Sequence, residues 1–271
     1  MKIRNVSWKR PSSLILLLWV ITLSLFAACS NNPASNSASN GGNSGSNASA
    51  NRKATGASAH DFLAANPYSK LLIEIQYAKG YEPTQEAIDS LISFLDRRLH
   101  KPDGIQVIKE SIADPGMSPY TIDQVDSLEQ KNRTQFNSGS TIAAYMLFLD
   151  GSSSEDTQNG QILGEAYLNT SMVFYEKSIM NNSGGFGQPS RAILEATVMR
   201  HEFGHNLGLV NLGTSMVVDH EDTSHPHHCD NKNCLMYWSV NTSNFVGNLA
   251  GGAIPQLDQN CLDDLQANGG K

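Results

Sequence analysis

The chain has 271 residues, of which 39% are hydrophobic and 17% charged, and its formal net charge is −7. Removing the four basic residues of the first ten positions leaves 15 of the 19 Lys and Arg against 26 Asp and Glu, a charge near −11. A charge of this sign argues against a nucleic-acid partner. About 210 residues remain after the N-terminal segments, enough for one well-cored domain or two small lobes.

The N-terminus has the pattern of a bacterial export signal. Basic residues precede an apolar run from Leu14 to Ala28, about fifteen residues, which is short for a membrane span and typical of a signal-peptide core. The run ends in Leu25-Phe26-Ala27-Ala28-Cys29, which resembles a lipobox. We therefore expect residues 1–28 to be removed and Cys29 to carry a lipid. A plain signal peptide and an uncleaved anchor are the alternatives to lipidation. All three possibilities place the protein outside the cytoplasm, and lipidation at Cys29 would make it a membrane-anchored bacterial lipoprotein.

A low-complexity segment comes after the cysteine. Residues 30–50 contain only Ser, Asn, Gly and Ala apart from Pro33. Such a composition cannot bury apolar surface and is typical of a disordered linker. The sequence therefore predicts a tether over residues 29–58 and a folded domain over residues 59–271.

Strand and helix patterns alternate through the domain. Segments rich in β-formers predict strands at 71–77, 104–112, 141–149, 164–168 and 171–175, the last two joined by a hairpin turn at Asn169-Thr170. Apolar residues at helical spacing predict helices that begin near Thr84, Thr121 and Ser190, and a short helix over 255–267 after a loop-rich tail. The order predicts an α+β fold with an α/β-like N-terminal part, a mixed twisted sheet covered by helices, and a loop-rich C-terminal subdomain.

The predicted helix after Ser190 carries the most informative motif, His201-Glu202-Phe203-Gly204-His205, with Gly208 three residues later. Residues four apart share one face of a helix, so His201 and His205 can bind a single Zn²⁺. Glu202 lies one step round the helix, close enough to accept a proton from water activated by the metal. The motif therefore predicts a zinc-dependent hydrolase in which Glu202 is the general base.

This motif resembles that of the metzincin clan of zinc peptidases, in which a third His lies three residues after the Gly and a methionine turn lies beneath the metal. Here the third position holds Asn211, a poor zinc ligand. Residues 228–236 read H-C-x4-C-x-M, which resembles the segment after the zinc helix in archaemetzincins, as though seventeen residues were inserted before it. The resemblance implies that His228 is the third ligand, that Met236 forms the methionine turn, and that substrate lies along the edge strand 164–168.

Several neighbouring residues remain alternatives. The third ligand could instead be His220, His225, His227 or Asn211, or a third protein ligand could be absent. The His and acidic residues of 219–228 could hold a second ion or form a solvated polar loop. Tyr237 comes directly after Met236 and is a candidate for assisting the oxyanion, although the clan's Tyr lies one position later.

Four cysteines occur, at positions 29, 229, 234 and 261. With Cys29 lipidated, three remain, which predicts one disulfide and one free thiol, or a metal site. Archaemetzincins bind a second, structural zinc through four Cys that include a C-x-x-C pair, and this chain has no such pair. The resemblance therefore implies a single catalytic zinc. A Cys229–Cys234 disulfide would clamp the loop that presents His228, and Cys261 pairing with either cysteine is the alternative.

These features together predict a zinc peptidase that hydrolyses peptide bonds in extracytoplasmic peptides or proteins. One alternative is a catalytically inactive, metal-binding lipoprotein that acts as a binding module, which Asn211 favours. The other is a surface protein whose His cluster only scavenges metal. An activity assay with zinc restored separates the first alternative from the enzyme, and weak, substoichiometric zinc binding would indicate the second.

Overall fold

The computed structural model describes residues 48–158, 160–249 and 251–271. The predicted export signal, Cys29 and the tether up to residue 47 lie outside these residues. Within the described ranges, no helix has the length and apolar character needed to cross a membrane.

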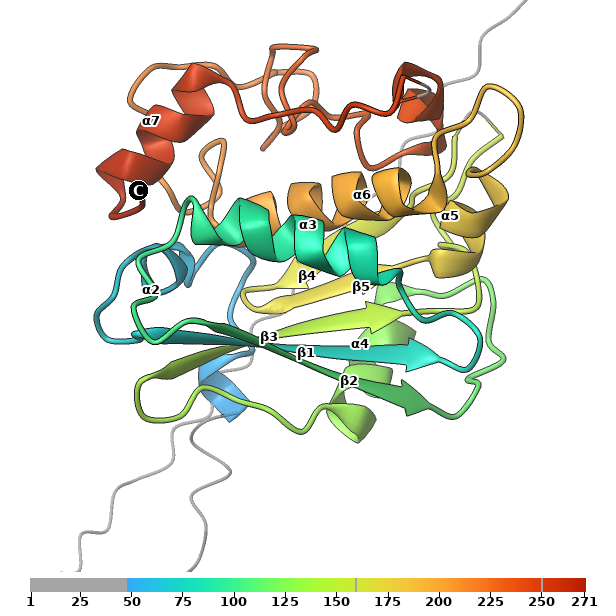
Figure 1. Cartoon of the computed structure of the whole chain (residues 1–271), viewed down its shortest axis with the longest axis horizontal. Helices are drawn as coiled ribbons and strands as arrows, with labels where there is room; N and C mark the ends of the chain where they lie inside the picture. Colours follow the sequence, from blue (N-terminus) through green and yellow to red (C-terminus); the bar gives the residue numbers. More distant parts are fainter. Residues whose placement is uncertain (1–47, 159, 250) are drawn as a thin grey trace, which may run out of the picture. The chain divides into compact units, whose positions relative to one another are not determined.

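The core of the domain is a five-stranded sheet with the order β2-β1-β3-β5-β4 (Figure 1). Four strands run parallel, and only β4 is antiparallel to its neighbour β5. This arrangement confirms the predicted mixed sheet, and Asn169-Thr170 form the predicted two-residue turn between Leu168 and Ser171. The strands are β1 (Lys70–Ala78), β2 (Ile105–Ile112), β3 (Thr141–Phe148), β4 (Gly164–Leu168) and β5 (Ser171–Phe174).

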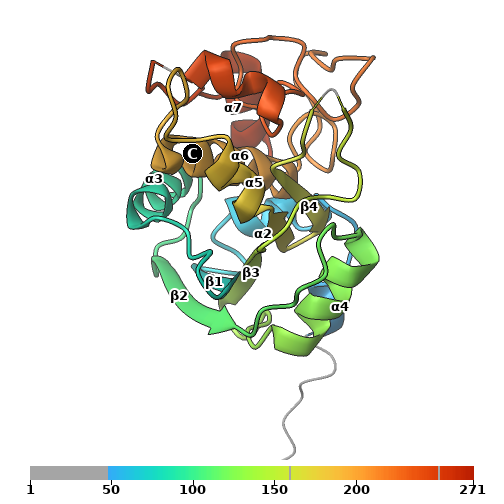
Figure 2. The same cartoon turned by 90° about the vertical axis from the view of Figure 1, so that its right-hand side faces the viewer.

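Helices cover both faces of the sheet. The helices α3 (Gln85–Asp96) and α6 (Arg191–Asn206) pack side by side on one face, and α4 (Ile122–Asn132) lies on the other (Figure 2). The loop-rich C-terminal segment, which ends in α7 (Gln259–Ala267), lies on the side of α6 away from the sheet (Figure 1). Three short elements were not predicted because they are too brief to show a period: α2 (Ala59–Leu63), α5 (Glu176–Asn181) and the 3₁₀ helix η1 (Ser243–Leu249).

Side-chain caps fix where the main helices begin. The hydroxyls of Thr84, Thr121 and Ser190 each accept a hydrogen bond from the backbone N–H three residues later, which satisfies a donor that the first turn leaves unpaired. At α4, Gln124 also bonds back to the N–H of Thr121 and completes a capping box. By fixing the first residue of each helix, these caps also fix which residues of the helix face the sheet.

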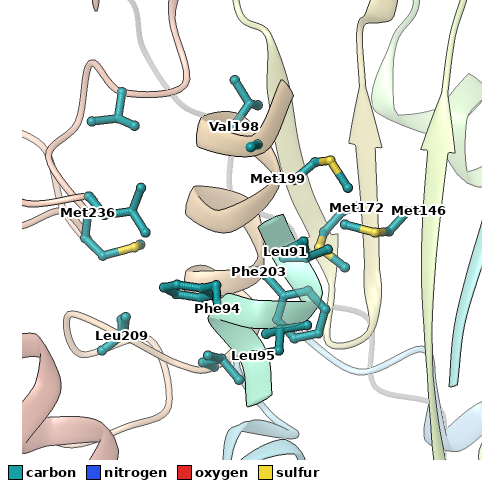
Figure 3. Packing of buried hydrophobic residues seen from close by; sticks show 14 of the residues in the cluster. Leu91, Phe94, Leu95, Met146, Met172, Val198, Met199, Phe203, Leu209 and Met236 are labelled. Atoms are coloured by element: carbon teal, nitrogen blue, oxygen red, sulfur yellow. The ribbon is translucent and has the colours of Figure 1, made fainter. Parts of the chain in front are cut away.

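The central strand β3 is buried on both faces, which accounts for its nearly unbroken apolar sequence. Its Tyr145 and Leu147 pack toward α4, whereas Ala144, Met146 and Phe148 pack toward α3 and α6. Figure 3 shows this second layer, where Met146 and Met172 of the sheet face Leu91 of α3 and Phe203 of α6. The α6 helix is therefore fixed between the sheet and the C-terminal segment.

The predicted tether is wrong for its described part, residues 48–58, which lie on the domain. The side chain of Asn51 is fully buried, and its amide nitrogen donates to Asn137 Oδ1 at 2.8 Å and to the carbonyl of Ala143 at 3.1 Å. The backbone of Lys53 exchanges hydrogen bonds with Asn169 in the β4–β5 turn. Composition missed this segment because its attachment depends on polar contacts rather than on buried apolar side chains.

Two buried carboxylates near the start of α6 share one guanidinium. Arg191 Nε lies 2.9 Å from Glu176 Oε1 and 2.7 Å from Glu195 Oε1. Burial, followed by the nearby charge of Glu195, raises the pKa of Glu176 to about 9. A single cation next to two buried carboxyl groups leaves one of them favoured in its protonated form.

This pair predicts a pH dependence of stability. The pKa of Glu176 is higher in the folded state than its ordinary value of ~4.3, so the folded state holds this proton more tightly than the unfolded chain does. The contribution of protonated Glu176 to the free energy of unfolding is therefore complete below that ordinary value and is lost as the pH rises toward 9. We expect Glu176→Gln, which stays neutral, to reduce the fall in unfolding free energy between about pH 5 and pH 9. Urea denaturation across this range measures the effect, with the exposed Glu86→Gln as control. An unchanged slope in Glu176→Gln would contradict the assignment.

Candidate functional site

Three imidazoles meet at the C-terminal end of α6. His201 and His205 come from successive turns of the helix, and His228 comes from the loop beyond it. The ring centroids form a triangle with sides of 4.8, 5.0 and 5.4 Å. One ligand atom from each ring lies within 4.8 Å of the other two. The structure thus brings together the three histidines that the sequence predicts as zinc ligands.

Backbone carbonyls fix two of the ring tautomers. His201 Nδ1 donates to the carbonyl of Leu235 at 2.7 Å, and His228 Nδ1 donates to that of Pro226 at 3.0 Å. Because a carbonyl can only accept, the proton of each neutral ring lies on Nδ1 and the lone pair lies on Nε2. An acceptor placed behind the ring in this way is what orients a metal-binding imidazole.

The donor set fits a zinc ion. The Nε2 atoms of His201 and His205 are 3.1 Å apart, close to the ~3.3 Å edge of a tetrahedron with Zn–N bonds of ~2.0–2.1 Å. His228 Nε2 is buried and has no hydrogen-bond partner in the described part of the chain. Burial lowers the pKa of all three histidines, that of His201 to about 3, which favours the neutral form that binds metals.

Glu202 lies beside this triangle with its side chain directed to β4. Its Oε2 accepts from the backbone N–H of Ala166 at 2.8 Å, and its Oε1 accepts from the Asn241 amide at 3.0 Å. Burial raises the pKa of Glu202 to about 8, and the two hydrogen bonds oppose this shift. Asn241 could not be found from the sequence, because it lies 39 residues beyond Glu202 in a loop without any recognisable motif.

His205, His228 and Glu202 line a pocket of ≈ 300 Å³, whereas His201 lies behind them and is fully buried. The helix, the edge strand and the segment before His228 each contribute a wall, and so do residues 51–58 through Thr55. The pocket is lined by Thr55, Glu165, Ala166, Glu202, His205, Leu212, Pro226, His227, His228 and Asn241. A pocket into which imidazole and carboxylate side chains converge has the form expected of a binding or catalytic site.

The outer edge of β4 is already hydrogen-bonded by other parts of this chain, which differs from the open edge implied by the clan resemblance. At Ala166, the N–H donates to Glu202 and the carbonyl accepts from Thr55 Oγ at 3.1 Å. The carbonyl of Gly164 accepts from Asn241 at 3.3 Å. A peptide that added as a further strand here would have to replace these contacts.

The other candidate residues lie elsewhere. Asn211 is exposed and outside the histidine triangle, and His225 stacks on Trp238 with ring centroids 4.2 Å apart. His227 lines the pocket but is directed to Glu221, 3.7 Å away. Tyr237 lines a different pocket of ≈ 560 Å³. His220 is buried among the cysteines, so the residues 219–228 do not form one polar cluster.

Two glycines of the zinc-helix motif have defined packing roles. Gly208 has a φ of 74°, and a Cβ there would lie 2.6 Å from the backbone nitrogen of Thr214, so the sharp turn after α6 requires glycine. Gly204 faces Met236, whose sulfur would lie 2.4 Å from a Cβ at that position. Figure 3 shows the Met236 sulfur directed toward the helix. Met236 therefore packs directly under the turn that carries His201 and His205, where the predicted methionine turn would be.

Comparison with known proteins gives fold-level similarities only. No family model matches the sequence, and no curated protein matches it. The chain is similar to the structure of archaemetzincin from Methanopyrus kandleri, with a TM-score of 0.49 and 15% identity, over 74% of this chain and 96% of that one. It is also similar to metalloproteinase-II from Bacteroides fragilis, with a TM-score of 0.40 and 18% identity, over 76% of this chain and 54% of that one. Neither similarity is strong enough to assign a function.

The predicted disulfide between Cys229 and Cys234 is not formed in the structure. Cys229, Cys234 and Cys261 are all free and fully buried, with Cys234 Sγ 3.6 Å from Cys261 Sγ. Besides the triangle of His201, His205 and His228, the described residues contain a second group with metal-ligand geometry. It consists of His220, Cys229, Asp258 and Cys261.

The contact between Gly204 and Met236 gives a testable prediction. We expect Gly204→Ala to destabilise the fold by about 1–3 kcal/mol, because the added methyl group overlaps a buried sulfur. Urea denaturation measures the loss, with Gly247→Ala as the control, since nothing lies within 4 Å of a Cβ at that position. The cost of Gly204→Ala should fall in a Met236→Ala background. An equal loss of unfolding free energy in both backgrounds would show that the destabilisation does not come from steric overlap between residue 204 and Met236.

Proposed function

We propose that the chain is a zinc-dependent peptidase that hydrolyses peptide bonds in extracytoplasmic peptides or proteins. One observation carries the proposal: His228, from a loop beyond the helix, is half-buried and completes a triangle with the buried His201 and His205, next to the carboxylate of Glu202. A Zn²⁺ held by these three rings would act as a Lewis acid toward the scissile carbonyl and make water acidic enough to lose a proton near neutral pH.

The residues of the chain supply the remaining steps. The Glu202 carboxylate accepts the proton of the attacking water and then delivers it to the nitrogen of the leaving amine. The hydrogen bonds from Ala166 and Asn241 hold this carboxylate at the pocket wall, while each oxygen keeps a second lone pair. The buried face of α6 keeps bulk water away from His201, which is fully enclosed.

The inactive binding module stays an alternative with a different outcome. The argument for an inactive module was that Asn211, a poor zinc ligand, holds the third-ligand position of the clan motif. The third corner of the triangle is instead occupied by His228, which supports the enzyme. The metal scavenger is less compatible with a buried, preoriented donor set, because a loose His cluster has no carbonyl acceptors that fix its tautomers.

The location of the enzyme is part of the same proposal. The basic and apolar N-terminal pattern and Cys29 support a lipoprotein held at a bacterial membrane, with the domain on its outer side. The acidic surface charge supports peptides or proteins, rather than nucleic acids, as partners.

Replacing Glu202 tests the catalytic role. We expect Glu202→Ala to retain zinc and to lose cleavage of an unstructured protein substrate by at least about 100-fold, because general base catalysis contributes on this order. Zinc content is measured by mass spectrometry and cleavage by fragment release, with Glu86→Ala as an exposed control. If Glu202→Ala, with zinc bound, cleaves as fast as the parent, the peptidase mechanism is wrong. If the parent with full zinc has no activity, the binding module is supported.

The third ligand is tested by a set of matched alanine variants. We expect His228→Ala to lose the catalytic zinc at chelator concentrations that leave the parent loaded, because only two protein ligands remain. Asn211→Ala and His225→Ala should keep it, since neither side chain belongs to the triangle. Equal zinc retention in His228→Ala and Asn211→Ala would remove His228 from the site.

A further inference from the structure

A second group of metal-binding side chains lies in the C-terminal part of the domain. Ligand atoms of His220, Cys229, Asp258 and Cys261 all lie within 4.8 Å of one another, and Cys234 Sγ is 3.6 Å from Cys261 Sγ. The three cysteines are fully buried, and His220 is 2% exposed. Free thiols concentrated in this way are a typical zinc-binding arrangement.

The separations between these atoms fit tetrahedral zinc. With Zn–S bonds of ~2.3 Å and Zn–N bonds of ~2.0–2.1 Å, the tetrahedral edges are ~3.8 Å between two sulfurs and ~3.6 Å between sulfur and nitrogen. The Cys234–Cys261 separation is 3.6 Å, and that of His220 Nδ1 from Cys229 Sγ is 3.4 Å. His220, Cys229 and Cys261 lie within 4.8 Å of one another, and Cys234 adjoins this group through its contact with Cys261.

A buried carboxylate orients the imidazole of His220. Asp264 Oδ2 lies 2.8 Å from His220 Nε2, and its Oδ1 accepts from the backbone N–H of Val217 at 2.6 Å. Because the carboxylate accepts, the Nε2 atom carries the proton and the Nδ1 atom directs its lone pair toward Cys229. A carboxylate that accepts from the far nitrogen of a ligating histidine is frequent in zinc sites.

Cys234 and Asp258 have different surroundings. Cys234 Sγ accepts from the backbone N–H groups of Met236 and Asp258, both at 3.4 Å, as a thiolate ligand would. The carboxylate of Asp258 is already engaged, since Oδ1 caps α7 at the N–H of Cys261 and Oδ2 accepts from Asn231 and, at 3.2 Å, from Cys229 Sγ. His220 therefore has the free lone pair, whereas Asp258 has other partners.

We propose that Cys229, Cys234, Cys261 and His220 bind a second, structural Zn²⁺. The expectation of a single zinc rested on the missing C-x-x-C pair. In this chain the fourth ligand is instead the imidazole of His220, which belongs to the segment between Asn211 and His228. Four protein ligands close the coordination sphere, so this ion has no open position for a substrate. The inference does not depend on the proposed peptidase activity.

Such an ion would join three pieces of chain that share little regular structure. These pieces are the segment that contains His220, the loop with Cys229 and Cys234, and α7 through Cys261. Cys229 is the residue directly after His228, so the ion would fix the backbone next to the third catalytic ligand. A loop-rich region of this kind commonly depends on a bound metal for its stability.

Cobalt substitution tests the site without relying on activity. The chain expressed from its full 271-residue sequence is purified under reducing conditions, its zinc is counted, and the metal is then exchanged for Co²⁺. We expect two zinc ions per chain and, with cobalt, a near-ultraviolet thiolate charge-transfer band. That band should persist in His228→Ala and Glu202→Ala, because their side chains belong to the catalytic triangle and its carboxylate. A cobalt-loaded parent chain without the band would overturn the proposal.

Single substitutions then identify the ligands. Cys234→Ser and His220→Ala should each lower the content from two zinc ions to about one, with the catalytic ion retained. His100→Ala, an exposed histidine outside both groups, should keep two. Loss of the second ion in Asp258→Asn but not in His220→Ala would overturn the role of His220. The parent is also purified without added reductant. A Cys234–Cys261 disulfide together with only one zinc ion would show that the second site is wrong. Thiols of Cys229, Cys234 and Cys261 that become reactive only after a chelator removes the metal would support the site.

Discussion

The hydrogen bond from His201 to the carbonyl of Leu235 joins the two halves of the candidate site. It connects the middle of α6, which packs on the sheet, with the loop that carries His228 and Met236. The same bond fixes the tautomer of a proposed ligand, so the position of the loop and the chemistry of the ring are set together. The close contact of Met236 with Gly204 leaves little freedom here. The packing between helix and loop is therefore the constraint on which the site depends.

The sequence predicted the fold well because most of its elements are long and strongly patterned. The strands have buried apolar runs, and the main helices have side-chain caps at Thr84, Thr121 and Ser190. The histidines of α6 were found because ligand spacing on a helix is a local property. His228 was found through the H-C-x4-C-x-M resemblance, and its position beside the other two rings is a long-range property that only the fold displays.

The features that the sequence did not reveal depend on contacts between distant segments. Asn241 reaches Glu202, and Thr55 reaches Ala166, through loops whose paths no local pattern specifies. The proposed role of His220 was hidden for the same reason, since its partners Cys261 and Asp264 lie more than forty residues further along the chain. Residues 51–58 were assigned to the tether because polar hydrogen bonding leaves no hydrophobic periodicity. Each error reflects a polar contact made across the fold.

The path of residues 51–58 places the entry point of the chain at the rim of the pocket, since Thr55 forms part of its wall. If Cys29 carries a lipid, residues 30–47 limit the distance between that lipid and the first described residue to at most ~65 Å. The opening of the candidate site would then stay within that distance of the lipid surface. Polypeptides that emerge from or rest on the lipid surface would then meet the opening of the candidate site far more often than polypeptides in bulk solution.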